Sequence, residues 1–132
     1  MCESIFCRVE LQNCKLLGSN FYGSSILNVV LNACIADYSI FAESRFKNVV
    51  IKDTSLKKAD FYNASFNRIQ LFRVALHQAQ LSGAKLKGLD FSECNIEGIG
   101  IRLEDLAGIT ITPLQAVDII KSLETGINIK TS

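Results

Sequence analysis

Two neighbouring blocks of five residues decide the fold of this chain: ADFYN at residues 59–63 and ASFNR at residues 64–68. Each block has a large apolar residue at its centre, and the same column continues at every fifth residue from Phe6 to Ile111. Every member of the column is Leu, Ile or Phe except Ala36. Side chains return to the same face about every 3.6 residues in a helix and about every 2.0 in a strand. A period of five therefore predicts a repeat protein.

The central column is expected to form the core of the repeat region, because apolar side chains that recur on one face are withdrawn from water. The side chains that we expect to anchor this core are Phe6, Leu11, Leu16, Phe21, Phe41, Phe46, Phe61, Phe66, Leu71, Leu76, Leu81 and Phe91. The small residue at Ala36 predicts a cavity or local repacking in which Ile35 or Tyr38 turns inward.

A second column, two residues before each centre, carries a slower rhythm. Its bulky members recur every twenty residues: Val9, Val29, Val49, Ile69, Leu89 and Ile109. Two residues after many centres stands Gly, Asn or Asp, which tolerate the backbone angles of tight turns, so each block should end in a corner. Four blocks per repeat of the slower rhythm predict a four-sided solenoid with twenty residues per coil.

The blocks at 59–68 resemble the pentapeptide-repeat family. The resemblance implies a right-handed quadrilateral parallel β-helix, an all-β solenoid, which we expect to occupy residues 1–111.

The rhythm changes at Thr112, and residues 112–132 are expected to form a separate C-terminal unit. Thr112, Pro113 and Gln115 fit the cap, the first position and the capping box of a helix. Apolar residues follow at helical spacing, and residues 127–130 alternate like a short edge strand. The unit is predicted to cap the last coil, to mediate dimerisation, or to do both, through Thr112, Pro113, Leu114, Val117, Ile120, Leu123, Ile127 and Ile129.

The same end of the chain carries a closer resemblance. The segments LKGLDFS at 86–92 and LAGITITPLQA at 106–116 resemble the C-terminal end of Qnr-like proteins from Gram-positive bacteria. This resemblance implies a twofold dimer built by the C-terminal helix and strand. It also implies binding of DNA gyrase or topoisomerase by mimicry of DNA, which relieves inhibition by quinolones.

Charge is unevenly distributed along a chain whose net charge is only +1. Residues 45–87 hold nine Lys and Arg against two Asp, a local charge of +7, whereas residues 88–132 have a local charge of −4. A dimer through the tail would bring acidic segments together, where they could meet a basic topoisomerase surface. Two alternatives are a scaffold or interaction rod unrelated to gyrase, and a basic rod that contacts nucleic acid.

No constellation of catalytic or metal-binding residues stands out. His77 is the only histidine and falls at an outward position, and the cysteines lack the CxxC spacing of metal sites. Free thiols are expected, with Cys14 and Cys34 inside and Cys7 outside. We therefore predict a non-enzymatic protein without cofactor, metal or small-molecule substrate.

The sequence also bears on where the protein resides and on whether its N-terminal end is covered. The N-terminus lacks a secretory signal, and no apolar run is long enough to span a membrane, so we expect a cytoplasmic protein. Apolar residues at outward positions cluster in the first coils, which predicts that something covers this end: Ile5, Leu17, Leu27, Val30, Ile35, Ile40 and Val50.

Overall fold

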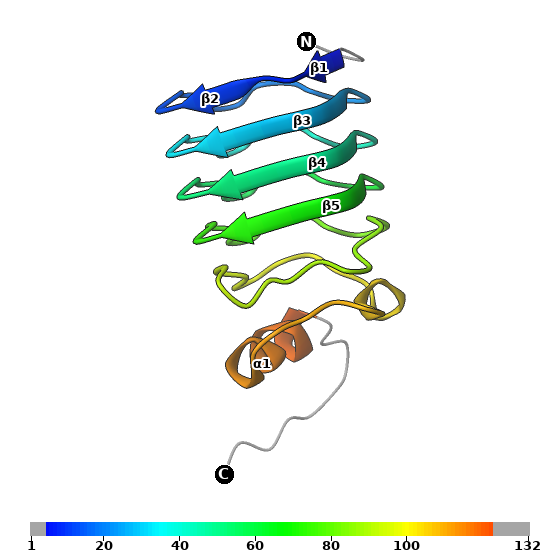
Figure 1. Cartoon of the computed structure of the whole chain (residues 1–132). Helices are drawn as coiled ribbons and strands as arrows, with labels where there is room; N and C mark the ends of the chain where they lie inside the picture. Colours follow the sequence, from blue (N-terminus) through cyan, green and yellow to red (C-terminus); the bar gives the residue numbers. More distant parts are fainter. Residues whose placement is uncertain (1–4, 123–132) are drawn as a thin grey trace.

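Parallel strands stacked one above another form the body of the molecule, and a single helix lies at its C-terminal end (Figure 1). The computed structural model describes residues 5–122, with side chains from Cys7 to Lys121. The elements are β1 (Ile5–Cys7), β2 (Glu10–Gln12), β3 (Ser25–Asn32), β4 (Arg45–Lys52), β5 (Ser65–Phe72), the 3-10 helix η1 (Leu103–Leu106) and α1 (Pro113–Ser122). The expected edge strand at 127–130, with Leu123, Ile127 and Ile129, lies outside the described residues.

The strands pair in parallel with a constant offset of twenty residues. Val29 of β3 pairs with Val49 of β4, which pairs in turn with Ile69 of β5. Isolated bridges keep the same offset on the other sides of the coil and beyond β5, as between residues 80 and 100 and between residues 90 and 110. The expected parallel β-solenoid with twenty residues per coil and a C-terminal helix is confirmed.

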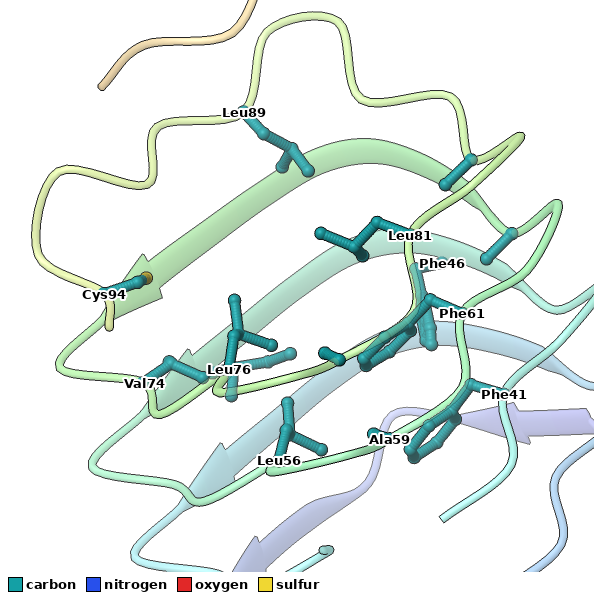
Figure 2. Close-up of a cluster of buried hydrophobic side chains, with 14 of the residues drawn as sticks. Phe41, Phe46, Leu56, Ala59, Phe61, Val74, Leu76, Leu81, Leu89 and Cys94 are labelled. Atoms are coloured by element: carbon teal, nitrogen blue, oxygen red, sulfur yellow. The ribbon is translucent and has the colours of Figure 1, made fainter. Parts of the chain in front are cut away.

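Aromatic rings from successive coils stack inside the solenoid (Figure 2). The ring of Phe41 lies 4.9 Å from that of Phe21 and 5.2 Å from that of Phe61, and both pairs are nearly coplanar. Phe46 and Phe66 form a second stack at 4.9 Å, tilted against the first. Burying each such side chain contributes about 1.5–3 kcal/mol. Short strands thus gain their stability from this interior.

The structure places the expected core residues in two groups. Six are buried: Phe41, Phe46, Phe61, Leu76, Leu81 and Phe91. Five others are partly buried and pack against the same core: Leu11, Leu16, Phe21, Phe66 and Leu71. Phe6 aligns with Ile26 in β1, but its side chain is outside the described part.

The expected repacking around Ala36 is wrong. Ala36 is fully buried, whereas Ile35 and Tyr38 are both exposed. Ile35 forms bridges to Lys15 in the coil before and to Ser55 in the coil after. Turning the Ile35 side chain inward would break both bridges. The backbone register is therefore kept, and Ile35 does not fill the space left by the small side chain of Ala36.

The corners fall where the sequence predicts them, two residues after the centre of a block. Backbone φ is positive there at expected residues such as Asn48, at 55°, but also at bulky ones such as Tyr38, at 62°, and Arg68, at 58°. Hydrogen bonds between coils pass through these positions, as from the Tyr38 N–H to the Lys57 carbonyl at 2.9 Å. The stacked coils therefore impose a left-handed conformation on residues that rarely adopt it alone.

Candidate interaction surfaces

The helix α1 has one face against the last coil and one face toward solvent. Ile119 and Gln115 make up the inner face, with 3% and 7% of their surfaces exposed. Leu114 is 83% exposed, Val117 39% and Ile120 42%. The sequence predicts that these three residues cap the last coil, mediate dimerisation or do both, and which of these roles they have remains a prediction. The buried residues of the helix are their neighbours Gln115 and Ile119. Leu114, Val117 and Ile120 define the "outer apolar face" of α1.

Gln115 uses both ends of its amide group, the oxygen for the helix cap and the nitrogen to hold α1 to the coil. Its Oε1 accepts a hydrogen bond from the Thr112 N–H at 2.9 Å, while the Gln115 N–H donates to Thr112 Oγ1 at 3.2 Å. This reciprocal pair is the predicted capping box. The Nε2 group donates to the carbonyls of Phe91, at 2.5 Å, and Cys94, at 2.8 Å.

The Cys94 carbonyl receives the hydrogen bond that a further coil would otherwise supply. In earlier coils, the carbonyl of Val74 accepts from the N–H of Asn95, twenty-one residues later, at 3.0 Å. The corresponding donor for Cys94 would be the backbone N–H of Gln115, which the capping box already uses. The side chain of Gln115 replaces its own backbone, so no buried carbonyl is left unpaired at this point. The sequence suggested the capping box but gave no sign of this second role.

The acidic segment after residue 88 contains both exposed and ion-paired carboxylates. Asp90, Glu93 and Glu97 are exposed. Asp105 is not: its side chain is 6% exposed and lies 3.0 Å from the Arg102 guanidinium, which lowers the pKa of this carboxyl. Only part of the negative charge counted from the sequence is therefore available to a partner.

Apolar side chains are also exposed on the N-terminal coils. Leu17, Ile35 and Ile40 are exposed, whereas Leu27, Val30 and Val50 are half-buried between neighbouring strands. Coverage of this end remains a prediction.

The titratable residues of the described part of the chain bear on metal binding and on nucleophilic chemistry. Among residues 5–122, no group of three or more His, Cys, Asp or Glu side chains is arranged to hold a metal ion. His77 is half-buried, and its Nδ1 has no hydrogen-bond partner in that part of the chain. Cys7 is an exposed free thiol, whereas burial raises the pKa of Cys94 to about 11. Cys94 is therefore an unreactive thiol near neutral pH.

The described helices are too short or too polar to cross a membrane.

Comparisons with known proteins agree with this architecture. A family model described as "Pentapeptide repeat region" matches residues 4–81, and one described as "Pentapeptide repeats (8 copies)" matches residues 72–98. A search of curated proteins finds no significant match. The crystal structure of Rfr23, a pentapeptide-repeat protein from the cyanobacterium Cyanothece 51142, matches this chain with a TM-score of 0.51, and the two sequences are 21% identical. The alignment covers 82% of this chain and only 64% of Rfr23.

Two further solved structures match less closely. HetL, involved in heterocyst differentiation regulation in Nostoc sp. strain PCC 7120, is 15% identical over 84% of each chain, with a TM-score of 0.39. A trypsin-treated form of QnrB1, a plasmid-mediated fluoroquinolone resistance protein, is 16% identical over 94% of this chain and 71% of its own, with a TM-score of 0.35. Similarity at this level carries no functional argument. Since a family model matches more than half of its residues, the chain belongs to the pentapeptide-repeat family.

Proposed function

We propose that the protein is a non-enzymatic interaction rod that dimerises through the outer apolar face of α1. The single observation that carries this proposal is the exposure of Leu114, Val117 and Ile120 on the side of the helix that faces away from the coil. Pentapeptide-repeat proteins generally serve as structural or interaction proteins. A surface for a partner, rather than a cleft for a substrate, is therefore the feature to explain.

A second copy of the chain is the partner that suits this face. Large apolar side chains gathered on one side of a helix favour burial against another apolar surface. A twofold axis brings the same stripe of both subunits together, so that Leu114, Val117 and Ile120 each find apolar neighbours. The sequence resemblance of residues 106–116 to the dimerising end of Qnr-like proteins supports the same arrangement.

Within such a dimer, we propose a type II topoisomerase as the partner of the central acidic segment. The exposed carboxylates of Asp90, Glu93 and Glu97 lie in the coil before η1 and α1, so dimerisation at α1 places two sets of them near the centre. Acidic side chains attract the basic surfaces with which topoisomerases bind DNA. The resemblance of residues 86–92 and 106–116 to Qnr-like proteins supports this choice of partner.

The oligomeric state tests the dimer. Sedimentation equilibrium is expected to give a dimer for the wild type and a monomer for Leu114→Glu combined with Val117→Glu, because two carboxylates would be buried at the interface. Leu17→Glu is the matched control, since Leu17 is also an exposed leucine, 62% accessible, but far from α1 in the sequence. The control should remain a dimer. A monomeric wild type at its highest soluble concentration contradicts the proposal.

Supercoiling by purified DNA gyrase tests the topoisomerase. The protein is titrated into the reaction with and without a quinolone, and it should change the supercoiling yield in a concentration-dependent way. The variant Asp90→Asn, Glu93→Gln, Glu97→Gln should lose the effect. The control variant Glu10→Gln, Glu43→Gln, Asp60→Asn removes the same charge elsewhere and should keep it. If the protein is a dimer but has no effect on gyrase, the proposal of a topoisomerase partner is rejected, and the proposal of an interaction rod with a different partner is retained.

A further inference from the structure

Along four consecutive coils, the charged residues on one side of the solenoid are all cations. Because residues twenty apart are stacked, the segments 25–28, 45–48, 65–68 and 85–88 lie one above another, at the starts of β3, β4 and β5 and in the coil beyond (Figure 1). Arg8 follows β1, which pairs with the start of β3. All the outward cations in this column are exposed: Arg8, Arg45, Lys47, Arg68, Lys85 and Lys87. We call this set the basic face.

The four segments of the basic face contain no carboxylate. The other outward residues of its four segments are mainly Ser and Asn, including Asn48, whose Nδ2 donates to Asn28 Oδ1 at 3.2 Å. Within residues 5–122, the ion pairs involve Arg73 with Asp53, and Arg102 with Glu104 and Asp105. None of the six cations of the basic face takes part in them. Asp105 follows Lys85 by twenty residues, but Arg102 already neutralises it.

The other sides of the rod are mixed in sign. At the ends of β4 and β5 stand Lys52, Asp53 and Arg73, which differ in sign. The Arg73 guanidinium lies 2.6 Å from the Asp53 carboxylate. The side that holds Lys57 and Lys58 also holds Asp37 and Glu97. The surplus of positive charge in residues 45–87 is thus concentrated by the coil geometry, because Arg45, Lys47, Arg68, Lys85 and Lys87 share one face.

We propose that the basic face binds the sugar–phosphate backbone of double-stranded nucleic acid without regard to base sequence. The cations form a rigid lattice, with alternate residues of a strand about 6.6 Å apart and neighbouring coils about 4.8 Å apart. Four coil steps separate Arg8 from Lys87, so the face extends over about 19 Å. A duplex presents one phosphate for about every 1.7 Å of its axis, which offers this lattice a partner at every step.

Details of the face favour a duplex over other polyanions. Arg45 Nη2 donates to Ser25 Oγ at 2.7 Å, which fixes the guanidinium before any ligand arrives and lowers the cost of ordering it. Single strands are held by stacking on aromatic side chains, and segments 25–28, 45–48, 65–68 and 85–88 have none directed outward. An exposed apolar residue that could enter a bilayer is also absent from these four segments, since Leu27 is half-buried.

Anisotropy of a fluorescent duplex of random sequence, about 20 base pairs long, tests the proposal. The wild type should bind with an affinity that falls as salt rises, and with four to six phosphate contacts the slope of log K against log salt should be about −4 to −5. The variant Arg45→Gln, Lys47→Gln, Lys85→Gln, Lys87→Gln should bind at least about tenfold more weakly, with a slope less steep by about 4.

A matched variant separates the face from the net charge. The variant Lys15→Gln, Lys52→Gln, Lys57→Gln, Lys58→Gln removes the same number of cations from the other sides. It should keep most of the affinity at about 0.15 M salt, because charges more than about 8 Å from the phosphates are largely screened at this ionic strength. Thermal melts of both variants verify that the coil is intact. Equal losses in the two variants, binding that does not depend on salt, or tighter binding to anionic vesicles than to the duplex would each overturn the proposal. It does not depend on dimerisation or on gyrase.

Discussion

The middle coils and the C-terminal end of this solenoid pair the same kinds of backbone carbonyl with different donors. In the middle, the hydroxyl groups of Ser39 and Ser44 donate to the carbonyls of Leu16 and Phe21, twenty-three residues earlier, at 2.8 and 2.7 Å. At the C-terminal end, the amide of Gln115 donates to the carbonyl of Phe91, twenty-four residues earlier. The coil that contains Ser39 and Ser44 thus uses short side-chain donors, whereas the end relies on one longer side chain.

This difference shows how stability is distributed along the rod. A buried residue of the middle coils has equivalent neighbours twenty residues before and after it, so its removal is felt in both directions. At the C-terminal end, the coupling to the last full coil passes through Gln115 and Ile119, the buried residues of α1. We expect middle positions to govern global unfolding and α1 to govern local opening, as in other stacked repeats.

The largest effect is expected from Phe61→Ala in the middle of the core. Phe61 is buried, stacks on Phe41 at 5.2 Å and lies 5.8 Å from the ring of Phe66. Truncation should cost about 3–5 kcal/mol of the free energy of unfolding, measured by urea denaturation. Phe21→Ala makes the same chemical change where the ring is partly buried, and it should cost about half as much. Equal losses would show that position along the column does not matter.

An intermediate effect is expected from Gln115→Ala, which removes the donor to two carbonyls. The Phe91 carbonyl keeps its hydrogen bond from the Cys94 N–H at 2.9 Å, but leaving the Cys94 carbonyl without a partner should cost about 1–3 kcal/mol. The loss should be local, and Cys94 reports it, because its thiol is buried and its pKa is raised to about 11. Alkylation of Cys94, followed by peptide mass spectrometry, should become faster in the variant.

The control for this experiment is Gln70→Ala, which truncates an exposed glutamine on β5. It should leave the alkylation rate of Cys94 unchanged. If Cys94 in Gln115→Ala is as slow as in the wild type, the amide of Gln115 does not hold the end closed.

The sequence was sufficient for the coil and insufficient for the surfaces. A period of five with a superimposed period of twenty determines which residues stack, so the pairing of residues 29, 49 and 69 could be foreseen. The direction in which α1 turns its side chains could not, because residues 114–120 are apolar on more than one side. Likewise, the local charge of +7 does not indicate which side of the rod is basic. That side follows only from the twenty-residue coil, which places Arg45 and Lys85 in the same column.

The corners mark another limit of the sequence. Gly, Asn and Asp indicate a turn, but the structure has positive φ at Ala33, Tyr38, Glu43 and Lys58 as well. Their residue types carry no signal for a left-handed backbone. The signal was their position: each of these four residues lies two residues after the central residue of its block.

The smallest effect, and one of opposite sign, is expected from Ala33→Gly at such a corner. Ala33 is exposed, has a φ of 55° and keeps its N–H bonded to the Lys52 carbonyl at 3.1 Å. An L-residue pays about 1–2 kcal/mol for this conformation, and glycine avoids that cost while losing about 0.5–1 kcal/mol through the entropy of the unfolded chain. The variant should therefore be more stable by up to about 1.5 kcal/mol in urea denaturation.

Ala75→Gly provides the comparison that gives this result its meaning. Ala75 lies outside the corners, without a positive φ, and bridges Ser55 and Asn95 in the coils on either side. The same substitution should here destabilise the protein by about 0.5–1 kcal/mol. Both variants change the unfolded chain in the same way, so opposite signs can arise only from the folded state. If both variants are destabilised, the coils hold Ala33 without strain, and corner geometry is set by the stacking of neighbours alone.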